Sequence, residues 1–153
     1  MRYYKKEIVL QEVPGEISLC YFICGCPLHC KGCHSAFTWN ENTGHLLEVN
    51  DYADTLKRYQ GYISCVLFMG GEWHEKELAE LLHIAKASGL NTCLYTGLNG
   101  VSPQLENELT YLKTGPWVPE LGGLDSPLTN QRMIQLKTKD CLNTVFQRDI
   151  LVG

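Results

Sequence analysis

The sequence predicts an α/β fold, in which a mostly parallel sheet curves into an open, partial barrel of strand–helix units. Apolar segments typical of buried strands alternate with segments whose apolar residues recur at helical spacing. This alternation is typical of parallel sheets with right-handed crossovers. The 153 residues suffice for a single domain, 1–153, whereas a closed barrel of eight units typically needs about 250 residues. The barrel is therefore expected to stay open.

Two strands and a long loop are expected in the first third of the chain. The first strand covers residues 6–13 and is ended by Pro14 and Gly15, which interrupt strands. The second covers residues 17–24 and is apolar almost throughout, as is typical of a strand buried on both faces in a parallel sheet. From there to about Asn50 the chain is irregular, and loops of that length in compact domains are usually functional.

Two amphipathic helices are expected in the middle of the chain. The first begins at Asn50 or Asp51, either of which can cap it, and ends at Gly61. The second covers residues 74–88 and ends at Gly89. Their buried faces would consist of Tyr52, Leu56 and Tyr59 in the first helix and Leu78, Leu81, Leu82 and Ala85 in the second.

Two further buried strands lead directly into polar or glycine-rich turns. Residues 63–69 are followed by the turn 70–72 (Gly-Gly-Glu), and residues 91–95 are followed by Thr96 and Gly97. Parallel strands place their carboxyl ends at one edge of the sheet, where α/β folds bind ligands. Both turns and the long loop after the second strand are therefore expected to meet at that edge.

The carboxyl-terminal part is expected to contain one short helix, a loop and three short strands. Ser102 is suited to the N-cap and Pro103 to the first position of a helix that runs to about Leu109. Residues 115–130 contain three prolines and three glycines, which predicts a surface loop. The expected strands cover residues 111–112, 133–136 and 144–146, the last two as a pair.

Three cysteines in the long loop, Cys26, Cys30 and Cys33, have the spacing C-x3-C-x2-C. Proline and glycines among them prevent regular structure, so the backbone can fold around a ligand. Thiolates that converge on one point suit iron–sulfur clusters or zinc. Structural zinc usually takes four protein ligands, whereas three thiolates on a cubane cluster leave its fourth iron open. The trio therefore favours a 4Fe-4S cluster with one open corner.

Two other uses of these cysteines stay open at this point. Cys24 lies close enough in sequence to complete a four-cysteine site for zinc or for an ordinary iron–sulfur cluster, and a disulfide scaffold is also conceivable. Cys141 lies in polar surroundings and has no assigned role. The cysteines expected to pack in the core as small apolar residues are Cys20, Cys65 and Cys93.

Composition favours a cytoplasmic location and, for any macromolecular partner, a protein. The chain has no long apolar segment and no signal-type start, which predicts neither a membrane span nor export. Its size and its few loops suit a reducing compartment better than a disulfide-rich secreted fold. The net charge of −4 gives no basic patch for nucleic acid or for an anionic membrane.

The cysteine loop resembles that of the radical S-adenosylmethionine (SAM) enzymes, and the resemblance implies a partial barrel of the radical SAM type. In that family three cysteines hold a 4Fe-4S cluster, here Cys26, Cys30 and Cys33. The open iron chelates the amino and carboxylate groups of SAM. An electron from the cluster then cleaves the sulfonium and releases a 5′-deoxyadenosyl radical. No separate acid–base dyad is expected.

The same resemblance implies which residues contact SAM. The turn 70–72 matches the double-glycine-plus-acid motif that meets the amino group of SAM, and Thr96 would touch the adenosyl group. Many relatives carry an aromatic residue where this chain has Gly32, so His34 or backbone groups would serve the adenine instead. The implied SAM contacts are Gly32, Cys33, His34, Gly70, Gly71, Glu72 and Thr96.

A narrower resemblance is to the activating proteins of anaerobic ribonucleotide reductases. It rests on residues 30–34, Thr38-Trp39, Thr43-Gly44, 95–97 and 129–131 (Thr-Asn-Gln). The family's role implies that the adenosyl radical takes a hydrogen atom from a glycine Cα of the large reductase subunit. A flavodoxin or ferredoxin would donate the electron.

Two alternatives remain: an activase of another glycyl radical enzyme, such as pyruvate formate-lyase, and a non-catalytic four-cysteine module. Tyr111, Trp117 and the loop 115–130 are candidates for docking the reductase.

Overall fold

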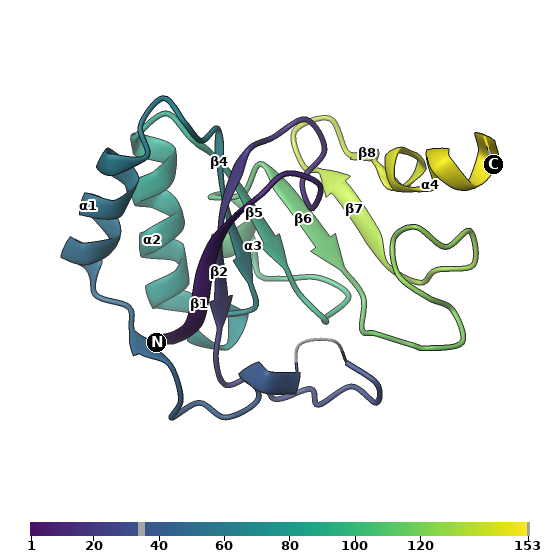
Figure 1. The fold of residues 1–153 in the computed structure, drawn as a ribbon, viewed down its shortest axis with the longest axis horizontal. Coiled ribbons are helices and arrows are strands. Elements are labelled where there is room, and N and C mark those ends of the chain that lie inside the picture. Colours follow the sequence, from purple (N-terminus) through teal and green to yellow (C-terminus); the bar gives the residue numbers. More distant parts are fainter. Residues whose placement is uncertain (34–35, 153) are drawn as a thin grey trace.

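The computed structural model describes residues 1–33 and 36–152, and within them the chain forms one open, eight-stranded mixed sheet (Figure 1). In spatial order the strands are β3 (His45–Leu46), β1 (Arg2–Val9), β2 (Ser18–Ile23), β4 (Cys65–Met69), β5 (Asn91–Tyr95), β6 (Tyr111–Thr114), β7 (Arg132–Gln135) and β8 (Asp140–Cys141). Both edge strands contain only two residues. Short edge strands offer little backbone for pairing with another sheet.

The expectation of a mostly parallel sheet is wrong for the sheet as a whole. Among the described strands, the β2–β4, β4–β5 and β5–β6 pairings are parallel, and the β1–β2, β1–β3, β6–β7 and β7–β8 pairings are antiparallel. Parallel neighbours need a long crossover, usually a helix, whereas short loops return the chain antiparallel. The loops 10–17 and 136–139 are too short for a crossover. The parallel arrangement is thus limited to the centre of the sheet.

Helices α1 (Val49–Arg58) and α2 (Glu75–Ala87) lie side by side on one face of the sheet (Figure 1). The predicted buried stripe of α2 is confirmed, since Leu78, Leu81, Leu82 and Ala85 are all buried. A shorter helix, α3 (Pro103–Glu106), precedes β6, and Ser102 caps it by accepting a hydrogen bond from the Leu105 N–H, as predicted. Helix α4 (Asn143–Val152) ends the described chain.

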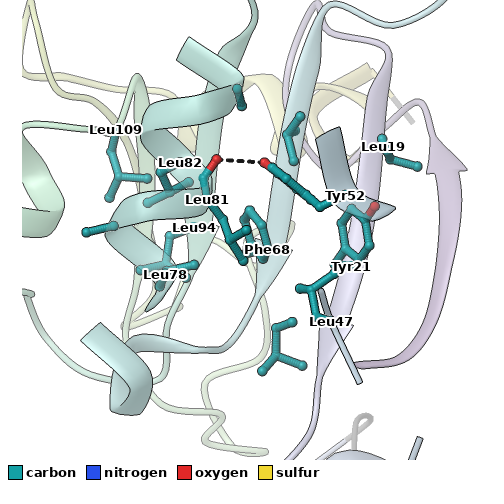
Figure 2. Close-up of a cluster of buried hydrophobic side chains, with 14 of the residues drawn as sticks. Leu19, Tyr21, Leu47, Tyr52, Phe68, Leu78, Leu81, Leu82, Leu94 and Leu109 are labelled. Atoms are coloured by element: carbon teal, nitrogen blue, oxygen red, sulfur yellow. Dashed lines mark hydrogen bonds between the residues drawn. The ribbon is translucent and has the colours of Figure 1, made fainter. Parts of the chain in front are cut away.

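The main hydrophobic core fills the space between these helices and the sheet (Figure 2). Tyr21 of β2 stacks on Phe68 of β4, with the ring centroids 5.6 Å apart. Tyr52 of α1 donates a hydrogen bond from its hydroxyl to the Leu81 carbonyl of α2, at 2.8 Å, and so keeps its buried polar group paired (Figure 2). This core fixes the two helices against the central strands.

A second core lies on the opposite face of the sheet and holds the three cysteines that were predicted to be packing residues. Cys20, Cys65 and Cys93 are fully buried there, as expected. Two loops and α4, in place of crossover helices, provide the cover: Val13 of the loop 10–17 belongs to this core, and Phe146 of α4 packs against it.

The Glu16 carboxylate anchors the loop 10–17 at the amino-terminal ends of the central strands. It accepts hydrogen bonds from Ser64 Oγ at 2.7 Å, from Asn91 Nδ2 at 2.6 Å and from the Tyr111 hydroxyl at 3.2 Å. These partners lie just before β4 and at the first residues of β5 and β6. One carboxylate therefore ties the β1–β2 loop to the amino-terminal ends of three strands.

Several predicted boundaries need correction. The first strand is Arg2–Val9 in place of residues 6–13, and residues 144–146 belong to α4 and not to a strand. The residue at the N-cap of α1 is Glu48, not Asn50 or Asp51, and helix α3 ends at Glu106. The strand at β6 extends from the predicted 111–112 to Thr114.

Among the described residues, no helix combines the length and the apolar character that crossing a bilayer requires.

Candidate functional site

The three segments that were expected to meet do line one cavity, of about 150 Å³, at the carboxyl end of the parallel strands. The cavity is open on one side, and most of its accessible lining is apolar. The predicted site residues that line it are Cys26, Cys30, Cys33, Gly70, Glu72 and Thr96. Gly32 and Gly71 lie next to lining residues without lining the cavity themselves, and His34 falls outside the described residues.

The cysteine loop leaves β2 and passes beneath the carboxyl end of the sheet (Figure 1). Its start is fixed by a hydrogen bond of 2.6 Å from the Gly25 N–H to the Thr38 carbonyl. Its end is a turn in which the Cys33 N–H donates to the Cys30 carbonyl at 3.0 Å. Between them, the His29 ring stacks on Trp39, with the ring centroids 4.4 Å apart. The three cysteines therefore stand on an irregular but well-connected loop.

Two other loops lie against the cysteine loop. Leu28 reaches Gly97, just after β5, so closely that a side chain at residue 97 would collide with it. Gly32 faces the side chains of Trp117 and Pro119, in the loop that follows β6. The walls of the cavity are thus formed by the ends of the strands and by the loops that follow them, with one side left open.

The donor set suits a cluster better than a single ion. All eight cysteines lie in the described residues, and none forms a disulfide, which excludes the disulfide scaffold. No three His, Cys, Asp or Glu side chains among the described residues converge so as to hold one metal ion. A cubane, however, presents a separate iron to each thiolate, so its three ligands need not meet at one point. Three cysteines that line one cavity satisfy that looser requirement.

Cys24 does not belong to this trio. Its side chain is buried on the sheet side of the loop, 1% exposed, and it does not line the cavity. Its Sγ instead accepts a hydrogen bond from Thr43 Oγ1 at 3.6 Å. The structure therefore argues against the four-cysteine module.

The pKa of Cys26 is raised, chiefly by burial and also by the charges of Glu72 and Cys33. Backbone N–H groups at Leu28 and His29 act in the opposite direction by hydrogen bonding to the thiolate. A metal or cluster must displace the proton from this thiol before it can bind.

The turn 70–72 has a backbone that requires glycine. Gly70 has φ +86°, and a Cβ there would lie 2.6 Å from the Trp73 ring, so no other residue fits. The Gly70 N–H donates to the Tyr95 carbonyl at 2.9 Å, which joins this turn to the end of β5. Part of the double-glycine motif is thus explained by packing alone.

Glu72 is held with one carboxylate oxygen paired and the other unpaired. Thr96 Oγ1 donates to Glu72 Oε1 at 2.7 Å, whereas Oε2 is buried without a hydrogen-bond partner among the described residues. Burial raises the pKa of Glu72, and the hydrogen bond from Thr96 and the charge of Lys113 partly offset that rise. A buried acceptor without a partner is costly, so the site fits a ligand that carries a donor such as an ammonium group.

Two tryptophans supply unpaired donors at the same cavity. The indole nitrogens of Trp39 and Trp73 are buried and have no hydrogen-bond partner among the described residues. Both side chains line the cavity. Together with Glu72, they give the cavity both donor and acceptor groups that a polar ligand can satisfy.

Lys113 is a site residue that the sequence reasoning missed. It lies on β6, is 9% exposed and lines the cavity. Its Nζ donates to the Gly115 carbonyl at 3.1 Å and lies 5.6 Å from the centroid of the Tyr95 ring. The predicted strand covers only residues 111–112, so Lys113 lies outside it and outside the predicted loop 115–130. The sequence does contain a signal. Side chains two residues apart in a strand point to the same face, so Lys113 is expected on the same face as Tyr111.

The segment 129–131 anchors the loop after β6. Asn130 Nδ2 donates to the Pro116 carbonyl at 3.1 Å, and Gln131, which lines the cavity, lies within hydrogen-bonding distance of the Gly115 carbonyl. Tyr111, by contrast, is buried in the second core, which rules it out as a docking residue. Trp117 lines the cavity and remains a candidate.

Comparison with known proteins agrees with an iron–sulfur site. Residues 13–114, two thirds of the chain, match the family described as a 4Fe-4S single cluster domain. A 93-residue stretch is 32% identical to the pyruvate formate-lyase-activating enzyme of Clostridium pasteurianum. That match covers 57% of this chain but only 39% of the relative's length.

Proposed function

This chain belongs to the 4Fe-4S single cluster domain family, and from that premise we propose that it is a radical SAM enzyme that activates a glycyl radical enzyme. We further propose that residues 1–153 act as a single domain with a partial barrel of the radical SAM type, in the cytoplasm. The observation that carries the proposal is the shared cavity. The three cysteines, Gly70 and Glu72 of the turn 70–72, and Thr96 come from separate parts of the chain and line it together.

The proposed partner is the large subunit of an anaerobic ribonucleotide reductase. A donor such as a flavodoxin or ferredoxin would supply one electron, and SAM would be cleaved to methionine and a 5′-deoxyadenosyl radical. That radical would take a hydrogen atom from a glycine Cα of the reductase. The products would be 5′-deoxyadenosine and a glycyl radical on the partner. The support is the sequence resemblance in residues 30–34, Thr38-Trp39, Thr43-Gly44, 95–97 and 129–131. We propose neither a nucleic acid nor a membrane as a partner.

Cys26, Cys30 and Cys33 would hold the cluster, which supplies the electron for SAM cleavage when it is bound. All three cysteines line the cavity. Glu72 lines the same cavity, and its unpaired oxygen would accept a hydrogen bond from the amino group of SAM, while Thr96 would keep that carboxylate in place. His34 and Gly32 remain proposed contacts of the adenosyl group.

The apolar lining of the cavity would protect a reactive radical. Tyr95, Met69 and Trp117 line it together with the site residues. A closed, water-poor site prevents side reactions of reactive intermediates. Because the cavity is open on one side, a segment of the partner protein would have to complete the enclosure.

The experiment that tests this proposal begins with anaerobic reconstitution of the cluster and analysis of bound iron and sulfide. With reductant and SAM, the wild-type protein should form 5′-deoxyadenosine. Cys30→Ala should abolish this product, whereas Cys24→Ser, at a cysteine outside the cavity, should largely retain it. Equal product formation by wild type and Cys30→Ala would refute the cluster assignment.

A second candidate is the activation of pyruvate formate-lyase, which the similarity to the clostridial enzyme favours. The two candidates share the same cavity chemistry and differ only in the protein partner. Mixing the reduced, SAM-loaded protein with each candidate partner should produce the doublet EPR signal of a glycyl radical with the true partner alone. A doublet with pyruvate formate-lyase and none with the reductase would replace our first choice by the second.

A further inference from the structure

Lys113 is the one cationic side chain among the described residues that line the cavity. Its ammonium group forms one hydrogen bond, to the Gly115 carbonyl, and faces the Tyr95 ring. A lysine that is buried to this extent without a bonded carboxylate is rare, because removing the charge from water is costly. The fold nevertheless places it on a central strand, with its charged end toward the site.

The groups around this ammonium are predominantly negative when the cysteines and Glu72 are deprotonated. Burial lowers the pKa of Lys113 to about 8, and the thiolates of Cys30 and Cys33 are the two largest influences in the opposite direction, followed by the Glu72 carboxylate. The side chain is therefore mostly protonated at pH 7. Its charge acts across an apolar cavity, where it is screened far less than it would be in water.

We propose that Lys113 is a positioning residue whose positive charge, in the cavity that Cys30 and Cys33 also line, stabilises the reduced form of the cluster that these cysteines would hold. The inference deepens the proposed function and rests on it. Reduction adds one negative charge to a cluster, and nearby charges and hydrogen bonds are known to set how readily a cluster is reduced. A buried cation at this place makes the cluster easier to reduce.

The test is a redox titration of the cluster-loaded protein in the absence of SAM, followed by the EPR signal of the reduced cluster. Lys113→Met removes the charge and keeps an apolar chain of similar length, and Lys113→Arg keeps the charge. Lys31→Met is the matched control, because Lys31 is adjacent to Cys30 in sequence but exposed to solvent. An exposed charge is screened by water and salt.

In Lys113→Met the ratio of reduced to oxidised cluster at a fixed potential should fall about tenfold, which corresponds to a shift of about 59 mV for one electron. Lys113→Arg should stay within about twofold of wild type, and so should Lys31→Met. An unchanged ratio in Lys113→Met with a fully assembled cluster would overturn the inference. So would an equal fall in Lys31→Met, because the effect would then not depend on the buried position.

The requirement for a positive charge can also be tested if a neutral variant fails to assemble the cluster. If Lys113→Met and Lys113→Gln both fail while Lys113→Arg assembles a normal cluster, the requirement for a positive charge is supported. If Lys113→Arg fails as well, the charge is not what the site needs, and the inference is wrong.

Two further readouts distinguish this inference from a role of Lys113 in SAM binding and from the proposed function itself. If Lys113 serves instead to bind the carboxylate of SAM, Lys113→Met will weaken SAM binding and leave the SAM-free titration unchanged, which overturns the inference. If the wild-type protein holds a cluster but cleaves no SAM, the proposed function fails while the redox shift can still be observed. The absence of any cluster in wild type would refute both.

Discussion

At the scale of single residues, the glycine after Thr43 shows how tightly the cysteine loop is seated against the sheet. Gly44 has φ +80°, and a Cβ built on it would lie 2.2 Å from the Tyr3 carbonyl oxygen and 3.2 Å from Cys24 Sγ. Gly61 has a similar φ of +85° but nothing within 4 Å of the corresponding position. The two glycines share the same backbone requirement and differ only in the space around them.

Gly44→Ala should therefore lower the free energy of unfolding of the cluster-free protein by about 3 kcal/mol or more, because strand β1 would have to move. Gly61→Ala should cost only the left-handed backbone strain, about 1 kcal/mol. Urea unfolding followed by circular dichroism gives both values. Similar losses for the two variants would show that the loop adjusts freely at Gly44.

Lys113 should destabilise the protein when no cluster is present. Its pKa falls from 10.5 to about 8 on folding, so the unfolded chain binds more protons between these values and stability rises with pH across that window. Below pH 8 the buried charge costs about 3 kcal/mol. Lys113→Met should therefore raise the unfolding free energy of the cluster-free protein at pH 7, and the gain should shrink as the pH rises above 8. Urea titrations at pH 7 and pH 10 would reveal it, and a loss of stability at pH 7 would contradict it.

At the scale of elements, helices and strands with a long apolar pattern were predicted well, whereas short or locally ambiguous elements were not. Strand β5 (Asn91–Tyr95) has the predicted bounds, and the buried stripe of α2 is confirmed, since each is set by a long apolar pattern. Strands β3 and β8 were missed because two residues leave no periodicity to detect. The antiparallel edges were missed because they depend on which neighbours pair, and that is a property of the whole sheet.

The last helix shows how tertiary contacts override local preference. Residues 144–146 (Thr-Val-Phe) are typical of a strand. Asn143, the first residue of α4, donates from Nδ2 to the Gln131 carbonyl at 2.8 Å and accepts from the Met133 N–H at 2.9 Å. These contacts fix the start of the helix on β7, where Phe146 can reach the second core.

Asn143→Ala removes both of these hydrogen bonds, so the Gln131 carbonyl and the Met133 N–H lose this partner. We expect the free energy of unfolding to fall by about 2 kcal/mol. Thr144→Ala, at the exposed neighbouring position, should change it by less than about 0.5 kcal/mol. Urea unfolding of the pair tests the difference, and an equal effect of the two changes would argue against a role for Asn143 in anchoring the helix.

At the scale of the whole molecule, the location of the site could be predicted but its full membership could not. A sequence pattern that identifies the strands also identifies their carboxyl ends, and parallel strands place these ends at one edge of the sheet. The proximity of Cys26, Glu72 and Thr96 could therefore be predicted from the sequence. The two unpaired tryptophan nitrogens could not, because they belong to segments that follow the strands. Side-chain burial in such segments is decided by packing that no single segment encodes. Lys113 was missed for a different reason, since the predicted strand stopped one residue before it.

Because the cavity joins segments from across the chain, a ligand in it should stabilise the whole fold. At a SAM concentration about 100 times its dissociation constant, the cluster-loaded protein should gain about 2.7 kcal/mol. The cluster-free protein should gain much less, since the proposed open iron would be missing. Anaerobic urea unfolding with and without SAM tests this, and equal stabilisation of both forms would show that SAM binds independently of the cluster.

The distribution of thiols has a practical consequence for future experiments. Three cysteines would be occupied in the cluster-loaded protein, four are buried, and Cys141 is exposed on strand β8 at the far edge of the sheet (Figure 1). A maleimide dye or a nitroxide should then attach at a single position without any engineered change. Such a label would report the approach of a partner protein, or its distance from the iron centre, from a position that does not line the cavity.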